Sequence, residues 1–147
     1  MSVSVVRHVG IVVADMSVSL PFYRDLLGME PWYDQTESGP YIETVTGVKN
    51  ARVRMVKLRA ASGGSVELLQ YLSHPGVVPP PRRAGDVGVN HVALQVADLT
   101  ALHGKLRAHG IRFISEPQVA PDGYAKVVYC RDPEGVIVEL VQVMPPR

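Results

Sequence analysis

The chain has 147 residues and a mass of 16.0 kDa, which is the length of a single domain. Its 15 basic and 14 acidic residues leave a net charge of +1, and this balance argues against electrostatic binding of nucleic acid. Its apolar runs are far shorter than the roughly 20 residues that cross a bilayer, and its first residues lack the pattern of a secretion signal. We therefore expect a cytoplasmic protein in which the single cysteine, Cys130, forms no intrachain disulfide.

The first half of the chain predicts a strand, a helix and three further strands. Residues 4–14 are β-branched and apolar enough for a buried strand. A helix follows, with Asp15 or Ser17 as its N-cap, Pro21 in its first turn and Gly28 at its end. Shorter strands are expected after it, at residues 41–46, 52–59 and 65–72.

The second half predicts the same order of elements after a proline-rich linker, residues 73–88. A strand is expected at residues 89–97, and the helix that follows has Thr100 as its N-cap and Gly110 at its end. Three more strands complete this half, at residues 111–115, 125–130 and 136–143.

Two sequence blocks of the first half return in the second. HVGIVVAD at residues 8–15 returns as HVALQVAD at 91–98, and SVELLQ at 65–70 returns as IVELVQ at 137–142. Their order is preserved, although the first half carries extra residues between its two blocks. The repeat predicts one α+β domain, residues 1–147, built from two βαβββ modules at about residues 4–72 and 89–143. We expect their curved mixed sheets to surround a shared cleft.

Four polar residues occupy equivalent positions of this repeat, in mostly apolar strands: His8, Glu67, His91 and Glu139. A buried carboxylate costs several kcal/mol unless a cation or hydrogen bonds compensate it. Two imidazoles and two carboxylates suit zinc, nickel, cobalt, manganese or ferrous iron, and their two negative charges balance those of one divalent ion. In a six-coordinate ion they leave two positions for water or substrate oxygens. We predict such a site; a hydrogen-bonded polar cluster without metal is the alternative interpretation.

A run of basic residues lies around the strand expected at residues 52–59. Lys49, Arg52, Arg54, Lys57 and Arg59 put five positive charges within eleven residues. Because Arg52 and Arg54 face one side of a strand while Lys57 and Arg59 face the other, we interpret the run as a solvated face rather than one anion site.

Together with FYRDLLGM at residues 22–29, NHVA at 90–93 and DPEG at 132–135, these residues give the chain a resemblance to the vicinal oxygen chelate superfamily. The resemblance covers nearly the whole chain. This superfamily includes glyoxalase I, methylmalonyl-CoA epimerase, extradiol dioxygenases and the bleomycin and fosfomycin resistance proteins. It implies a shared fold and a homodimer, but its members carry out several kinds of chemistry.

Within the superfamily, a His, Glu, His, Glu ligand set resembles those of glyoxalase I and the epimerase. Both act next to a carbonyl, where the metal polarises the oxygen and a carboxylate removes the neighbouring proton. The resemblance therefore implies a lyase or isomerase that forms an enolate or enediolate from a small carbonyl or thioester substrate. We expect Glu67 or Glu139 to be the catalytic base and to swing off the ion when substrate arrives.

Two departures from glyoxalase I weaken a glutathione pocket. Bacterial glyoxalase I usually has arginine at the position of Val12 and asparagine at the position of Tyr71. The segment that follows Glu67 resembles the epimerase, whose separate catalytic glutamate has no counterpart in residues 50–57. The alternatives are an extradiol dioxygenase that uses ferrous iron and three ligands, with Glu67 outside the ligand set, and a non-enzymatic binding or resistance protein.

Overall fold

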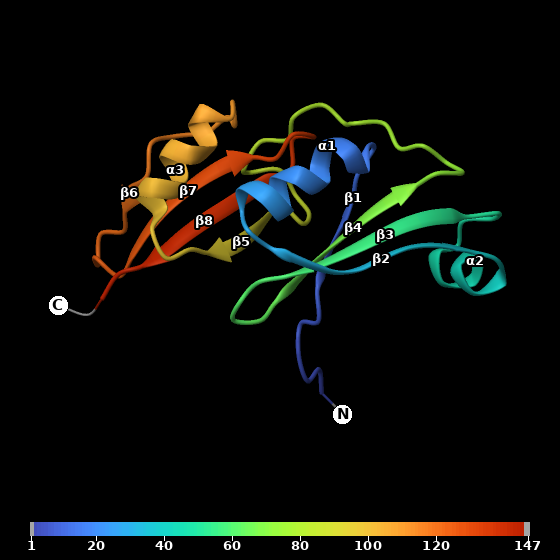
Figure 1. The fold of residues 1–147 in the computed structure, drawn as a ribbon. Coiled ribbons are helices and arrows are strands. Elements are labelled where there is room, and N and C mark those ends of the chain that lie inside the picture. Colours follow the sequence, from blue (N-terminus) through green and yellow to red (C-terminus); the bar gives the residue numbers. More distant parts are fainter. Residues whose placement is uncertain (1, 146–147) are drawn as a thin grey trace. The chain divides into compact units, whose positions relative to one another are not determined.

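The computed structural model describes residues 2–145 and divides into two compact units, one ending at Val78 and the other beginning at Pro79. Each unit contains a four-stranded mixed sheet with helical segments beside it (Figure 1). The expected α+β class and the two similar modules are therefore confirmed. Within residues 2–145, every helix is too short or too polar to cross a membrane.

The first module has the strand order β1-β4-β3-β2. β1 runs parallel to β4, whereas β3 pairs antiparallel with both β4 and β2. Its strands are β1 (Val9–Val12), β2 (Glu30–Ser38), β3 (Arg52–Arg59) and β4 (Ser65–Tyr71), and its helical segments are α1 (Met16–Pro21), η1 (Phe22–Leu26) and α2 (Pro40–Thr46).

The second module repeats this topology in the strand order β5-β8-β7-β6. β5 runs parallel to β8, and the other two pairings are antiparallel. Its strands are β5 (His91–Gln95), β6 (Gln118–Val119), β7 (Ala125–Arg131) and β8 (Ile137–Val143), and its helix is α3 (Leu99–Ala108).

The repeated glutamine of VELLQ and VELVQ fixes the helix of each module to its sheet. Gln70 lies three residues after Glu67 and therefore faces the opposite side of β4. There its Oε1 accepts a hydrogen bond of 3.2 Å from the backbone N–H of Met16. Gln142 accepts the equivalent bond of 2.9 Å from Leu99. Each glutamate thus lies on the face of its sheet opposite α1 or α3.

The first helical segment begins at an expected cap, but its proline lies further along the helix than predicted. The side chain of Asp15 accepts a hydrogen bond from Ser17 N and caps α1. Pro21 is the last residue of α1 rather than part of its first turn. Because proline lacks an N–H, the regular ladder stops there, and η1 continues with a wider π turn in which Leu27 N donates to Phe22 O. Gly28, at φ 74°, ends the segment as predicted.

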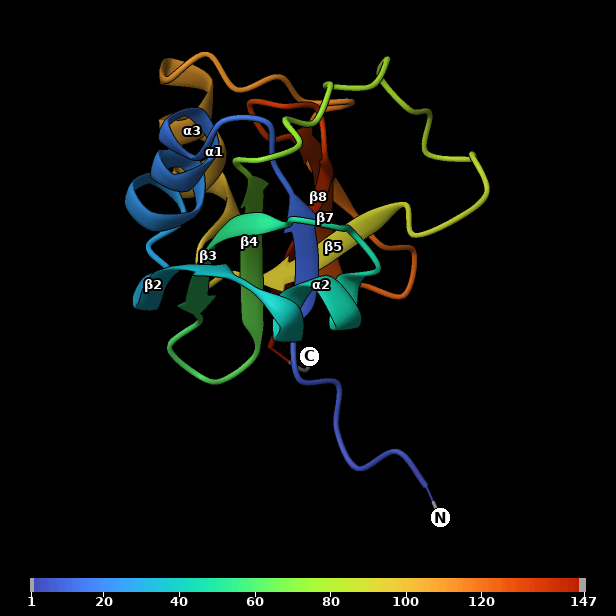
Figure 2. The same ribbon diagram turned by 90° about the vertical axis from the view of Figure 1, so that its right-hand side faces the viewer.

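The prediction of a strand at residues 41–46 is wrong, because this segment forms the helix α2. Pro40 begins the helix and Gly47, at φ 70°, ends it. The hydroxyls of Thr44 and Thr46 donate back to carbonyls one turn earlier, as Thr46 does to Ile42 O at 2.7 Å. Ile42 is buried against Val53 of β3. α2 lies beside β2 and occupies part of the extra length of the first module (Figure 2).

Other element boundaries also differ from the expectation. The strand expected at residues 4–14 pairs only at Val9–Val12, and β2 was missed because it is a polar edge strand that contains Pro31. The strand expected at residues 111–115 reduces to one bridge between Phe113 and Cys130. Asp98, not Thr100, caps α3, through a 3.0 Å bond from Ala101 N.

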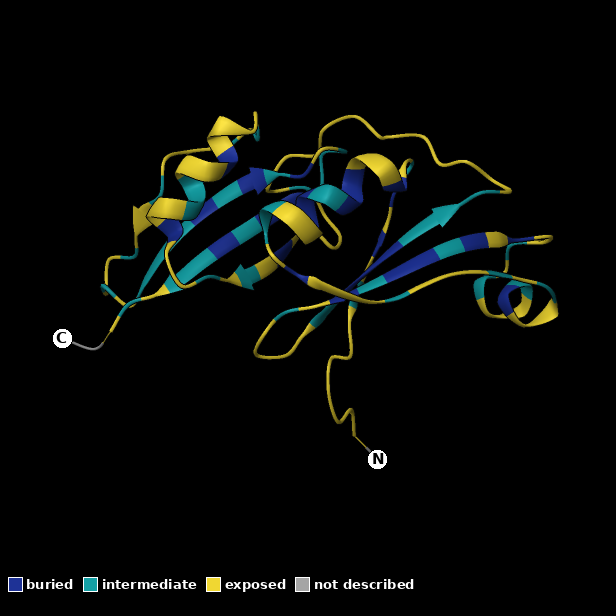
Figure 3. Cartoon of the chain, in the orientation of Figure 1, coloured by how far each residue is buried: buried dark blue, intermediate teal, exposed yellow. Residues whose placement is uncertain are grey.

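Burial is concentrated in the two central strands of each sheet. In Figure 3 the dark stretches follow β3 and β4 in the first module and β7 and β8 in the second. Leu58 and Leu68 are fully buried in the first module, as are Val138 and Leu140 in the second. These apolar side chains hold the strands that carry the two predicted glutamates.

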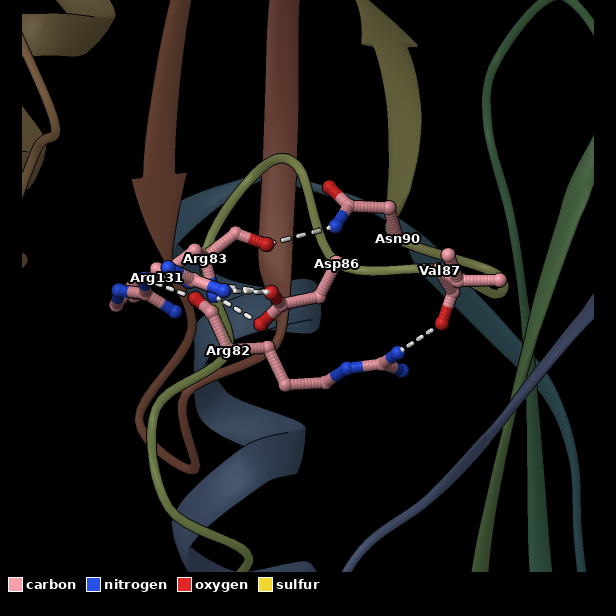
Figure 4. Close-up of polar contacts among 6 residues, drawn as sticks. All are labelled: Arg82, Arg83, Asp86, Val87, Asn90 and Arg131. Atoms are coloured by element: carbon pink, nitrogen blue, oxygen red, sulfur yellow. Dashed lines mark hydrogen bonds and ion pairs between the residues drawn. The ribbon is translucent and has the colours of Figure 1, made fainter.

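The second part of the predicted linker is fixed against the second module. The guanidinium of Arg131 donates to Arg82 O at 2.6 Å and to Gly135 O at 3.0 Å. Arg83 forms an ion pair with Asp86, and Asn90 Nδ2 donates to Arg83 O at 3.0 Å (Figure 4). These bonds hold the backbone on which β5 begins.

Candidate functional site

The first module brings His8 and Glu67 together on one face of its sheet. Gly10 pairs with Glu67 in the parallel ladder, and His8 lies two residues before Gly10, so that its side chain points to the same face. His8 Nε2 lies 3.1 Å from Glu67 Oε2. The parallel pairing of two distant segments creates this contact.

The second module builds the same pair from His91 and Glu139. Ala93 pairs with Glu139, and His91 again lies two residues earlier on the same face. His91 Nε2 lies 3.0 Å from Glu139 Oε2. The repeated sequence blocks thus form the same contact in each module, between one imidazole and one carboxylate.

The residue directly across the antiparallel ladder from each glutamate differs between the modules. Lys57 lies opposite Glu67, and its Nζ is 3.2 Å from Glu67 Oε1. Tyr129 lies opposite Glu139, and its ring centroid is 5.1 Å from that of His91. Sequence reasoning had placed Lys57 on a solvated face and did not consider Tyr129. Both precede their glutamate by ten residues, and this shared spacing is the signal that could have identified them.

Aromatic rings of β2 flank Lys57. Its Nζ lies 4.9 Å from the ring centroid of Tyr33, its partner across the ladder, and 5.8 Å from that of Trp32. The Tyr33 hydroxyl donates to Glu37 Oε1 at 2.6 Å, and this bond raises the pKa of Tyr33. Lys57 is therefore enclosed between an aromatic surface and a carboxylate.

Two other cations of the run, Arg54 and Arg59, lie in ion pairs near the surface. Arg54 binds both oxygens of Asp34 and holds the pKa of that carboxyl below its usual value. Arg59 contacts Glu30, and both side chains are more than half exposed. The interpretation as a solvated face describes Arg54 and Arg59, but not Lys57.

Burial differs between the two glutamates. Glu67 is 7% exposed, and both of its oxygens face cationic or potentially cationic groups. The side chain of Glu139 is 19% exposed, and among residues 2–145 its only ion-pair partner is His91. Burial and the nearby charge of Glu139 raise the pKa of Tyr129, so its phenol stays neutral near pH 7.

Cys130 does not belong to the candidate site. It is fully buried, and its position next to Tyr129 on β7 turns its side chain to the opposite face. Burial raises the pKa of its thiol to about 12, which removes the thiolate needed for a nucleophile.

The donor atoms of each pair fit a divalent ion. Two ligand atoms that are each about 2.1 Å from one ion and at right angles to each other lie about 3 Å apart. The two imidazole–carboxylate distances, 3.1 and 3.0 Å, match this value and also match a hydrogen bond. Within residues 2–145 no three His, Cys, Asp or Glu side chains gather at one point, so each module contributes two candidate ligands. The four-residue metal site, which joins the two modules, stays a prediction.

Comparison with known proteins shows the family. The model of the glyoxalase/bleomycin resistance protein/dioxygenase superfamily matches residues 5–140. A 2-epi-5-epi-valiolone epimerase from Actinomyces sp. is 30% identical over 94% of this chain and 79% of that protein. A protein of Synechocystis sp. named "Probable lactoylglutathione lyase" is 28% identical, over 92% of each chain.

A solved structure shows the same fold. A glyoxalase family protein from Bacillus cereus superposes with a TM-score of 0.89 at 20% identity, over 99% of this chain and 97% of that one. Together with the two repeated modules, these matches confirm the resemblance seen in the sequence: the chain belongs to the glyoxalase/bleomycin resistance protein/dioxygenase superfamily.

Proposed function

We propose that this protein is a divalent-metal-dependent isomerase or lyase that moves a proton at the carbon next to a carbonyl. The observation that carries the proposal is the pair of equivalent contacts, His8 with Glu67 and His91 with Glu139, on the sheet face opposite α1 in the first module and opposite α3 in the second. The epimerase and lyase names among its relatives belong to those proteins and support this class of reaction here.

The four paired residues would hold the ion, because imidazole and carboxylate groups are ligands for zinc, nickel, cobalt, manganese and ferrous iron. When bound, the metal supplies a Lewis acid that polarises the carbonyl oxygen of the substrate. The protein would bind a small carbonyl compound or thioester as substrate. The cytoplasmic location and the homodimer stay predictions.

Glu139 is the better candidate for the carboxylate that moves the proton. A ligand that becomes a base must turn toward the substrate carbon, and this requires an oxygen without another strong partner. Both oxygens of Glu67 are engaged, whereas Glu139 is more exposed and is paired only with His91 among the described residues. Glu139 would take the proton from one face of the carbon, and the opposite face would receive a proton from water or from a second acid. The neutral Tyr129 lies on the same face of the sheet as Glu139.

Epimerisation is the reaction we favour. Val12 and Tyr71 stand where bacterial glyoxalase I usually has arginine and asparagine. Val12 is exposed on β1, and Tyr71 packs against the cluster around Ile42 and Val53. Neither side chain supplies a charged group for glutathione. An epimerase requires that a proton leave one face of a carbon and that a proton reach the opposite face of the same carbon.

Exchange of that proton with solvent tests the proposal. The protein is loaded separately with zinc, nickel, cobalt and manganese and incubated in D₂O with 2-keto, α-hydroxyketone and 2-methylacyl thioester compounds, and deuterium incorporation is followed by NMR. We expect metal-dependent exchange in one of these classes. In Glu139→Gln the exchange rate should fall by about 10³-fold, whereas Glu30→Gln, which changes an exposed carboxylate, should exchange as the native protein does.

Two results would contradict this function. The first is exchange that proceeds equally well in Glu139→Gln and in the native protein. The second is an absence of exchange with every metal, combined with oxygen consumption when the iron-loaded protein meets a catechol, which would support the dioxygenase alternative.

A further inference from the structure

The two oxygens of Glu67 have different partners. Oε2 lies 3.1 Å from His8 Nε2, on the side of the predicted metal ligand, and Oε1 lies 3.2 Å from Lys57 Nζ. The side chain of Glu67 is 10% exposed, so water does not compete strongly for either oxygen. One oxygen of Glu67 is therefore available to a metal, while the other is occupied by an ammonium group.

Lys57 is held in this position from several sides. Its backbone lies directly opposite Glu67 on one side and Tyr33 on the other, within the same antiparallel ladder. Its Nζ is close to the rings of Tyr33 and Trp32, and Tyr33 is itself anchored to Glu37. A lysine that only solvates a strand face would not be enclosed in this way.

We propose that Lys57 is a positioning residue that restricts Glu67 to ligating the metal through a single oxygen. This inference rests on the proposed metal site and adds a residue that the ligand set does not contain. The ammonium occupies Oε1, so the carboxylate presents only Oε2 beside His8. The second module has Tyr129 at the equivalent position, so Glu139 has no such restriction.

The restriction matters because coordination positions are limited. In a six-coordinate ion, four ligands that each use one atom leave two positions, enough for two oxygens of a substrate. A carboxylate that binds through both oxygens occupies one of these positions. The positive charge of Lys57 also opposes the charge of the ion, so the lysine weakens metal binding while it preserves room for the substrate.

Cobalt binding tests the proposal, because Co²⁺ reports its coordination through visible absorption. The metal-free native protein is compared with Lys57→Met, which keeps the length of the side chain but not its charge, and with Lys57→Arg, which keeps the charge. Arg59→Met is the matched control, because it removes a cation from the same face of β3 without touching Glu67. Circular dichroism establishes that each variant is folded, and Lys57→Gln replaces Lys57→Met if the latter is not.

We expect Lys57→Met to bind Co²⁺ about threefold to tenfold more tightly than the native protein. Its absorption bands should shift as the second carboxylate oxygen replaces a water ligand, and the KM for substrate should rise. Lys57→Arg should restore the native spectrum, and Arg59→Met should match the native protein in both spectrum and affinity.

Unchanged or weaker Co²⁺ binding in Lys57→Met, with the native spectrum, would overturn the role of Lys57 while leaving the proposed function intact. A native protein that binds no Co²⁺ would overturn both. A purely structural role for Lys57 would lower stability without changing the cobalt spectrum, and that result would also overturn the proposal.

Discussion

The two modules place the same pair of side chains in different electrostatic surroundings. In each module a parallel strand pairing brings an imidazole within about 3 Å of a carboxylate. Across the adjacent antiparallel pairing, the first module supplies the ammonium of Lys57 and the second supplies the phenol of Tyr129. The comparison shows that topology determines the contact, whereas one residue across the ladder determines how firmly the carboxylate is held.

This difference separates two roles that the repeat alone would make identical. Glu67, with a partner on each oxygen, is suited to remain a ligand. Glu139, with one partner among the described residues, is suited to move a proton. In the proposed function, the two glutamates of this duplicated fold therefore have different roles.

The largest effect is expected when the cation is transferred to the second module. Tyr129→Lys places an ammonium across the ladder from Glu139, where it would hold the carboxylate as Lys57 holds Glu67. We expect the rate of proton exchange to fall by about 10²-fold or more, because the base is no longer free. Deuterium incorporation measures the rate. Tyr129→Phe is the control and should retain most of the activity, and equal activity in Tyr129→Lys would show that the residue across the ladder does not control the carboxylate.

A second difference between the modules is α2, which has no counterpart among the described residues of the second module, 79–145. Ile42 of α2 is buried against Val53, Met55 and Ala51. Ile42→Ala should destabilise the first module by about 2–5 kcal/mol, because it leaves a cavity under the helix. Amide hydrogen exchange should show the loss in β3 and α2 and little change in β7 and β8. Val45→Ala, on the exposed side of the same helix, should have little effect. Equal loss of protection in both modules would contradict this localisation.

The smallest effect is expected at the cap of α3. Asp98→Ala should cost about 1 kcal/mol of unfolding free energy, because Ala101 N loses its partner. Thr100→Ala should cost less, because Thr100 makes only an exposed bond with Lys126. Urea denaturation of both variants compares them directly. A larger loss of unfolding free energy in Thr100→Ala than in Asp98→Ala would contradict this assignment and support Thr100 as the N-cap, as the sequence predicted.

The repeat made the fold and the two pairs predictable. The return of HVGIVVAD as HVALQVAD and of SVELLQ as IVELVQ, in the same order, indicates two copies of one module. The alternation of side chains then places His8 with Glu67 and His91 with Glu139 on a common face once the strands pair in parallel. Both inferences depend on long-range regularity, which a single sequence can show.

The errors arose where local signals conflict with the tertiary structure. The β-branched residues of Tyr41–Thr46 favour a strand, but Pro40, Gly47 and the burial of Ile42 favour a helix. β2 has no apolar alternation, because it is an exposed edge strand. The contact of Lys57 with Glu67 was missed because it is set by the register of β3 against β4, which the charge pattern of one strand does not reveal.

The central claim is that the two modules hold one ion together, and metal content tests it most directly. Mass spectrometry of the native protein, His8→Ala and His91→Ala would give the number of ions per chain. The account predicts about one divalent ion in the native protein and almost none in either variant, since each removes a ligand of the same site. Two ions per chain, or full occupancy in either variant, would contradict it.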